Sequence, residues 1–273
     1  MILPYRILLI GFLAWISFPV RIVLADEEIK LEDLPCLSVV EIKGDFDHVQ
    51  GIAVDEHNLW LTSVNRKNKT GHLHTYNRNT GALIRQTPVH EGGRYHPGGI
   101  TLEGDSIWIP VSTYSREGST TIECRDKGTL ELRSRFFVED HIGCIAAGGD
   151  QIIGANWDAR IIYIWDKEGH LRAKIENPRD TRYQDLKWIG GELAASGLED
   201  GQGVVDWLSL PALDRIKRIR GGKTGRGISY MNEGMAVFNH QLFLLPEDGP
   251  SSRLFIFSLT PPGNGGNSPG STP

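Results

Sequence analysis

Three histidines recur in similar sequence surroundings: His48, His96 and His141 each lie four residues before an isoleucine that begins an apolar run. In two later segments, Gln184 and Glu233 lie two residues before the corresponding apolar residue. Neutral imidazoles suit divalent ions such as Mn and Zn, and an amide and a carboxylate complete a set that leaves positions open for water or substrate. We predict that these five side chains bind a divalent metal ion, for which Mn, Zn and Ca are the candidates. The alternative is a structural role, in which the histidines form hydrogen bonds to neighbouring segments and fill the centre of the fold.

Carboxylates occupy a second repeated position. Asp158, Glu199 and Glu247 are expected in loops that open on the same side as the histidines. A carboxylate with a shifted pKa in a pocket can act as a general acid or base, so we predict these three as catalytic residues. The alternative for each is an ordinary solvated turn residue. Aromatic side chains that could offer flat surfaces to a sugar or another ring are Tyr95, Tyr114 and Trp157.

An internal repeat supplies the elements that would position these residues, with a period of roughly 40 to 50 residues, the range of β-propeller blades. Five segments align, and their first apolar runs begin at or near His48, His96, His141, Gln184 and Glu233. In each segment a second apolar run follows across a polar turn, which predicts a hairpin. A third run follows in every segment, and a fourth in all but the last. Four short strands per unit predict an all-β chain that folds as a five-bladed β-propeller.

The last unit has no fourth strand of its own, because Leu259 leads into a stretch of Pro and Gly that cannot continue a sheet. The β-branched run at 37–42 precedes the first unit, and we expect it to close the ring as the outer strand of the fifth blade. Inner strands of a propeller begin around one axis, so residues at the same repeat position would face one another. A β-sandwich with coincidental spacing is the alternative.

The two ends of the chain differ from the repeat. Residues 1–25 combine a short basic leader, an apolar run and a small-residue cleavage site, which predicts a signal peptide and an exported protein, periplasmic or extracellular. The apolar run is too short to cross a bilayer, so we expect no membrane association after cleavage. Residues 26–260 are the expected propeller domain, and residues 261–273 are expected to be a disordered tail rich in Pro, Gly and Ser.

The composition is that of an ordinary globular domain, with 23% charged residues and a formal net charge of -5. Nucleic-acid binding surfaces usually carry a basic excess, and here the basic run at 215–220 is isolated and is expected to be a solvated strand face. We therefore expect no nucleic-acid partner, a monomer, and a small-molecule or carbohydrate ligand.

Two segments resemble exported five-bladed propellers of the glutamine cyclotransferase type. Phe46-Asp-His-Val-Gln50-Gly51 is similar to the F-x-Q-G start of that family, with two further residues between Phe and Gln, and Asn232-Glu233-Gly234 is similar to its E-G turn. This resemblance implies cyclization of amino-terminal glutamine. The whole chain resembles exported bacterial and fungal propellers with no assigned function. The ring of histidines with a glutamine is also similar, in arrangement, to the manganese site of oligogalacturonate lyase propellers, which implies a metal-assisted lyase or hydrolase.

Three functional predictions result. The leading one is a metal-assisted lyase or hydrolase that acts on a small polar or carbohydrate substrate at the axis. The second is a non-catalytic ligand-binding or interaction propeller, in which the histidines are structural. The third is an activity like that of the glutaminyl cyclotransferases.

Overall fold

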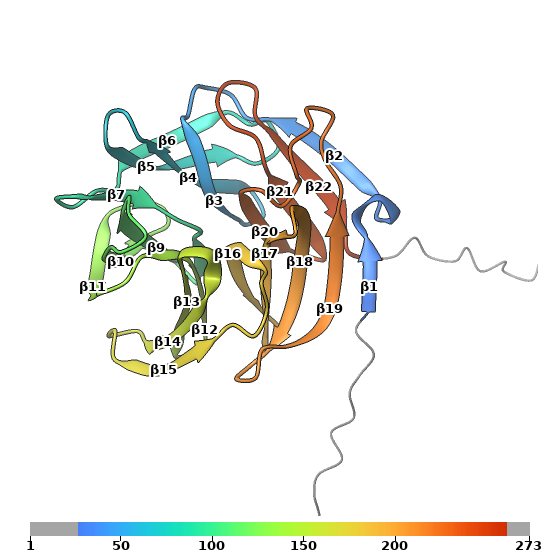
Figure 1. The fold of residues 1–273 in the computed structure, drawn as a ribbon. Helices are drawn as coiled ribbons and strands as arrows, with labels where there is room; N and C mark the ends of the chain where they lie inside the picture. Colours follow the sequence, from blue (N-terminus) through green and yellow to red (C-terminus); the bar gives the residue numbers. More distant parts are fainter. Residues whose placement is uncertain (1–26, 261–273) are drawn as a thin grey trace, which may run out of the picture.

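Five small β-sheets are arranged in a ring about a central axis (Figure 1). The computed structural model describes residues 27–260. Each sheet has four antiparallel strand positions from the axis outward, and one sheet has an additional outer strand. The predicted fold class, an all-β five-bladed propeller, is confirmed. The predicted signal peptide (1–25) and the predicted tail (261–273) lie outside the described residues.

The first three blades follow the chain order, and each begins with its inner strand. Blade 1 contains β3 (His48–Val54), β4 (Asn58–Asn65), β5 (Thr70–Asn77) and β6 (Leu83–Pro88). Blade 2 contains β7 (Arg94–Pro97) and β8 (Thr101–Glu103), which share the inner position, then β9 (Ser106–Thr113), β10 (Thr120–Asp126) and β11 (Leu132–Val138). Blade 3 contains β12 (Ile142–Gly148), β13 (Gln151–Asn156), β14 (Ile161–Asp166) and β15 (Leu171–Glu176).

The last two blades each include a strand from the start of the described chain. Blade 4 contains β16 (Arg182–Ile189), β17 (Glu192–Glu199), β18 (Gln202–Ser209) and β19 (Asp214–Gly221), with β1 (Glu27–Lys30) outside them. Blade 5 contains β20 (Gly234–Phe238), β21 (Gln241–Leu245), β22 (Arg253–Ser258) and β2 (Cys36–Glu41). Two short 3-10 helices are η1 (Leu31–Asp33) and η2 (Trp157–Ala159). No helix within residues 27–260 is long and apolar enough to cross a membrane.

Apolar side chains are buried between neighbouring blades. In β4, Leu59 and Leu61 pack against blade 5, whereas Trp60 between them packs against blade 2. Successive side chains of a strand point to opposite faces, so one strand supplies the core on both of its sides. A cluster of this kind lies at each junction between blades. This two-sided burial makes the strands recognisable as apolar runs in the sequence.

Strand β2 closes the ring as the outer strand of blade 5. It pairs antiparallel with β22, with Val39 opposite Phe255 and Val40 opposite Leu254. The strand that the sequence predicted at 37–42 is therefore confirmed, with its bounds one residue earlier. Because β2 comes from the start of the domain and β22 from its end, the ladder between them covers an edge of β22 that would otherwise be unpaired.

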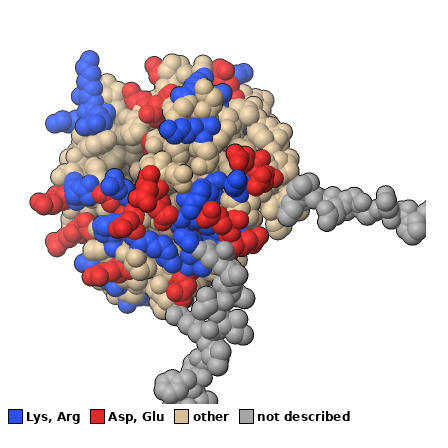
Figure 2. Space-filling model, turned by 45° about the vertical axis from the view of Figure 1, so that its right-hand side comes forward, with Lys and Arg blue, Asp and Glu red and all other residues tan. Residues whose placement is uncertain are grey.

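An additional strand, β1, lies parallel to β19 and is not predicted by the repeat. Glu28 of β1 forms an ion pair with Arg220 of β19 at 3.0 Å. Figure 2 shows basic and acidic side chains interspersed over this face of the molecule. The basic run at 215–220 is thus only partly the solvated face expected from the sequence, because Arg218 is 1% exposed and binds Asp206.

A buried ion pair lies at the axis, where it joins four blades. The Asp185 carboxylate accepts hydrogen bonds from the backbone N–H of Ile52 in blade 1 (3.3 Å) and of Met235 in blade 5 (3.0 Å). It also accepts one from Lys187 Nζ at 2.5 Å. Lys187 donates a further hydrogen bond to the carbonyl oxygen of Ile100 in blade 2, at 2.8 Å. The pair therefore fills the axis just beyond the residues that begin the inner strands.

Close packing at the axis also explains the divided inner strand of blade 2. A Cβ atom at Gly99 would lie 2.6 Å from Asp185 Oδ1 and 2.7 Å from Cys144 Cβ. The Gly99 N–H donates to the Gly143 carbonyl oxygen of blade 3 at 2.9 Å. The segment between β7 and β8 thus leaves the ladder of its own blade to bind the next one, which only a residue without a side chain permits at this distance.

Candidate functional site

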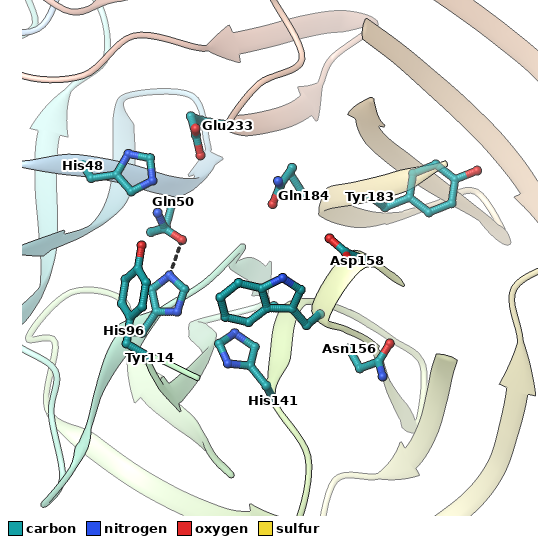
Figure 3. A pocket seen from close by; sticks show the side chains of 12 residues that line it. His48, Gln50, His96, Tyr114, His141, Asn156, Asp158, Tyr183, Gln184 and Glu233 are labelled. Carbon is teal, nitrogen blue, oxygen red and sulfur yellow. Dashed lines mark hydrogen bonds between the residues drawn. The ribbon is translucent and has the colours of Figure 1, made fainter. Parts of the chain in front are cut away.

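A pocket with a volume of about 160 Å³ lies at the end of the axis where the inner strands begin (Figure 3). The inner strands and the residues directly before them contribute His48, Gln50, His96, His141, Gly143, Tyr183, Gln184 and Glu233. The loops and strand ends on this side contribute Tyr114, Asn156, Trp157 and Asp158. At about 30 Å³ per water molecule, this volume corresponds to about five waters. The pocket therefore admits a small molecule or the end group of a larger one.

The structure brings all five predicted metal ligands to this pocket, as Figure 3 shows for His48, His96, His141, Gln184 and Glu233. They come from all five blades, because each lies where an inner strand begins. Residues from two repeat positions thus meet at the axis, the three histidines from one position and Gln184 and Glu233 from the other. Asp158, a predicted catalytic residue, also lines the pocket.

His48 is held by a carboxylate from the neighbouring blade. Its Nδ1 lies 2.9 Å from Asp248 Oδ2, and the other oxygen of Asp248 accepts the backbone N–H of Val49 at 2.9 Å. Because the Asp248 carboxylate accepts this hydrogen bond, the ring donates it from Nδ1, which leaves Nε2 as the other nitrogen of the ring. His48 is thereby oriented as a proton acceptor beside Glu233 (Figure 3).

Glu233 is a buried carboxyl group in the pocket wall, with only 8% of the residue exposed. Burial raises the pKa of Glu233 well above the usual range of a carboxyl group, and the nearby negative charge of Asp248 raises this pKa further. Asn232 Nδ2 donates a hydrogen bond to Glu233 Oε1 at 2.6 Å, which fixes one oxygen. The raised pKa favours the protonated form of Glu233, in which the carboxyl group can donate a proton.

His96 and His141 form the opposite wall with two aromatic rings. The amide of Gln50 donates to the Val49 carbonyl oxygen, so its Oε1 faces His96 Nε2 at 2.7 Å and the imidazole must donate this hydrogen bond. Burial lowers the pKa of His96 to about 3, so the ring is neutral. The His96 ring stacks on Tyr114 with centroids 4.2 Å apart.

His141 is engaged in a similar way. Its Nδ1 donates to the Ser115 carbonyl oxygen at 2.9 Å, and its ring lies with its centroid 4.5 Å from that of Trp157. Burial lowers the pKa of His141 despite the hydrogen bond from its ring to the backbone of Ser115. This wall of the pocket is consequently polar, neutral and rigidly held.

Metal binding requires that several donor atoms converge on one point. Within residues 27–260, no group of three or more His, Cys, Asp or Glu side chains is arranged to hold a metal ion. The three pocket histidines do use one ring nitrogen each to bind an acceptor, as metal-ligating histidines do, but the remaining donor atoms do not meet. The described side chains do not fit a metal centre in this arrangement, and metal binding by the five residues stays a prediction.

Two of the predicted catalytic carboxylates lie away from the pocket. Glu199 binds Arg218, with a contact of 3.0 Å, and this hydrogen bond lowers the pKa of Glu199 to about 2. Glu247 is 1% exposed and lies between Arg253 and Arg226. Burial by itself would raise the pKa of Glu247, but the two arginines lower it below its usual value. Both groups are bound ions in the structure, and neither lines the pocket that contains Asp158.

Comparison with known sequences identifies the family to which the chain belongs. A model for a family of unknown function (DUF6454) matches residues 37–190, which is more than half of the chain. The chain belongs to this family. The matched part extends from β2 through β16 and includes four of the five residues predicted as metal ligands, whereas Glu233 lies beyond it. No curated protein matches the chain.

Solved structures similar to this chain include the glutaminyl cyclase of Myxococcus xanthus, with a TM-score of 0.59 and 12% identity over 80% of this chain and 96% of the cyclase. The PQQ-bound aldose sugar dehydrogenase of Streptomyces coelicolor has a TM-score of 0.46 and 11% identity over 82% of this chain and 97% of the dehydrogenase. BamB of Moraxella catarrhalis has a TM-score of 0.44 and 17% identity over 77% of this chain and 60% of BamB. At these identities, the likeness to the cyclase shows the propeller fold.

Asp248 and Gln50 are site residues that sequence reasoning did not assign. Asp248 lies in the loop that was expected to supply an acid, but the selected residue was its neighbour Glu247. The two side chains diverge, because Glu247 turns towards Arg253 within blade 5 and Asp248 crosses to His48 in blade 1. Gln50 is at the same repeat position as Gln184 and Glu233, and that register was the available signal for it.

Proposed function

We propose that this protein is an acid–base enzyme that acts on a small polar molecule, or on the polar end group of a larger one, in the axial pocket. The observation that carries the proposal is the pairing of two groups with opposite roles. Burial raises the pKa of Glu233 well above its usual range, which favours the form that donates a proton, and Asp248 holds His48 through Nδ1, which leaves Nε2 as the nitrogen that can accept one. A buried carboxyl group with a raised pKa beside an imidazole that a carboxylate orients is a common basis for acid–base catalysis.

The geometry suggests how the roles divide. His48 Nε2 removes a proton from one atom of the substrate, and Glu233 gives its proton to another atom, such as that of a leaving group. Asp248 is a positioning residue that keeps the His48 lone pair directed at the substrate. Tyr114 and Trp157 supply flat walls that restrict how the substrate lies. Elimination and hydrolysis both need such a proton transfer, so lyase and hydrolase reactions are the classes we propose.

A variant series tests this proposal. Purified protein is assayed against a panel of small esters, amides, uronate oligosaccharides and amino-terminal glutaminyl peptides. With an active substrate, Glu233→Gln and His48→Asn should each lower kcat/KM by about 100-fold or more, which is the usual contribution of a general acid or base. His240→Asn, at an exposed histidine on the β20–β21 turn, should leave it unchanged.

The pH profile separates a catalytic role from a structural one. Activity should fall as the pH rises through the raised pKa of Glu233, and Glu233→Gln should remove this limb while its melting temperature stays near that of the wild type. Equal activity of wild type and Glu233→Gln would refute the proposal. Loss of activity in chelator with recovery on adding Mn or Zn would instead support the predicted metal-assisted reaction. A ligand that binds and is recovered unchanged would support the non-catalytic binding propeller.

Cyclization of amino-terminal glutamine is a second candidate, favoured by one specific observation. The two segments that resemble the glutamine cyclotransferases both bring a side chain into the pocket, Gln50 from one and Glu233 from the other. In this reaction the α-amine nitrogen attacks the side-chain carbonyl carbon and ammonia leaves. His48 would take a proton from the amine, and Glu233 would protonate the departing nitrogen. Ammonia release from a glutaminyl peptide, with none from the matched asparaginyl peptide, tests it, and no release from either overturns it.

A further inference from the structure

A guanidinium group lies against one of the aromatic rings that line the axial pocket. Arg66 begins the loop between β4 and β5, and its Cζ lies 4.6 Å from the centroid of the Tyr114 ring. Tyr114 lines the pocket and stacks on His96, so Arg66 sits against the outside of a pocket wall. The positive charge of Arg66 lowers the pKa of His96 and the pKa of Tyr114, although burial is the larger influence on both groups. Arg66 therefore lies close enough to the pocket for its charge to act on these two residues.

The hydrogen-bonding edges of Arg66 are available to a ligand. The residue is exposed, and among residues 27–260 it has an aromatic contact but no ion pair or hydrogen bond with a side chain or carbonyl group. Stacking on a ring uses the face of a guanidinium group and leaves its N–H donors free in the plane. These donors form a fork that matches the two oxygens of a carboxylate.

Arg116 provides the contrast on the other side of the mouth. It lies over the Trp157 ring at 5.4 Å, a position similar to that of Arg66 on Tyr114. Arg116 is bound to Asp158 at 2.5 Å, so its charge is already compensated by a carboxylate of this chain. Of these two arginines, Arg66 is the one whose charge no carboxylate of residues 27–260 compensates.

The pocket interior determines which end of a ligand Arg66 would bind. The residues that line the pocket include no Lys or Arg. The buried ones among them are two imidazoles with lowered pKa values, the phenol of Tyr183 and the carboxyl group of Glu233 with its raised pKa. An anionic group placed inside would lose its hydration without gaining a cation. A ligand would thus place its neutral polar end inside and its charged end at the rim.

We propose that the axial pocket binds small carboxylates, with the carboxylate held by Arg66 at the mouth and the neutral end directed towards Glu233. The inference rests on the proposed function only in taking the axial pocket as the ligand site, and it requires no catalytic step. It narrows the substrate class from small polar molecules to carboxylate-bearing ones.

Binding of matched pairs of probes tests this proposal. Acetate, lactate and succinate are compared with acetamide, lactamide and succinamide, respectively, at constant ionic strength, by calorimetric titration and by tryptophan fluorescence. In the wild type, at least one carboxylate should bind about tenfold or more tightly than its amide, since a hydrogen-bonded charge pair would be lost in the amide. Absence of saturable binding by all three carboxylates, or equal affinity for carboxylate and amide, overturns the proposal.

Two variants locate the charge. Arg66→Gln should lower the affinity for the carboxylate by about tenfold and leave the affinity for the amide unchanged. Lys67→Gln removes the same charge one residue away and should change the affinity by less than about twofold, as expected for an exposed charge without a direct contact. Equal losses of carboxylate affinity in the two variants would show a general effect of positive charge rather than a direct contact, and would overturn the assignment to Arg66. Because the readout is binding, inactivity of the enzyme would refute the acid–base proposal alone.

Discussion

Replacing Asp185 with alanine tests whether the buried ion pair at the axis holds the blades together. The side chain is fully buried and accepts hydrogen bonds from residues of three blades, including Ile52 and Met235. Its removal leaves Lys187 buried at 6% exposure without the carboxylate that binds it. Breaking a buried pair by removing one partner costs about 3 to 5 kcal/mol, because the remaining charge has no compensation.

The corresponding change in melting temperature is large enough to measure by circular dichroism. For a domain of this size, 1 kcal/mol corresponds to about 2 to 4 °C, so Asp185→Ala should lower the Tm by about 6 to 20 °C. Asp105→Ala is the matched control, because Asp105 is 83% exposed and its contact with Lys127 is 3.8 Å long. This control should shift the Tm by less than about 2 °C.

A double variant separates the unpaired charge from lost packing. Asp185→Leu with Lys187→Met removes both charges, and it should be more stable than Asp185→Ala because no uncompensated ion remains. If Asp185→Ala lowers the Tm no more than Asp105→Ala does, the axial pair does not hold the blades together and this reasoning is refuted.

Two further predictions concern the outer parts of the blades. The pKa of Glu199 lies at about 2 in the folded protein against an ordinary 4.5, so its stabilising effect is complete above about pH 5 and is lost as the pH falls towards 2. In acid titrations followed by circular dichroism, Glu199→Gln should remove about 3 kcal/mol of this pH dependence of stability. An unchanged loss of stability in acid would contradict the Arg218 contact as its cause. A chain that starts at Lys43 lacks β2 and should lose cooperative thermal unfolding. A chain that starts at Pro35 keeps β2 and should unfold cooperatively. Cooperative unfolding of both chains would show that the β2–β22 ladder is not needed to close the ring of blades.

The fold could be predicted from the sequence because each blade is built from hairpins of neighbouring segments. The apolar runs recur at a nearly constant interval, and adjacent residues such as Leu59 and Trp60 are both buried, each against a different blade. Closure by β2 was also predictable, since the last unit lacked a strand and the first was preceded by one. Strand β1 was not, because it adds to a blade that was already complete.

The site was predictable only where it follows the repeat. His48, His96 and His141 share one register, so the sequence placed them together correctly. The roles of the acids depend on partners that no repeat encodes: Glu199 binds an arginine two strands away, and Asp248 reaches a histidine in another blade. The raised pKa of Glu233 likewise depends on its burial in the assembled ring, which spacing alone does not reveal.

The ion pair of Asp185 and Lys187 also affects how a ligand enters and leaves the pocket. Since Asp185 is fully buried and Lys187 is 6% exposed, the pair occupies the axis beyond Gln184, and we expect a ligand to enter and leave the pocket at its mouth. A reaction that splits one molecule into two fragments would then release them in sequence, the fragment nearer the rim first. The fragment left at the bottom would act as a competitive inhibitor of the next turnover.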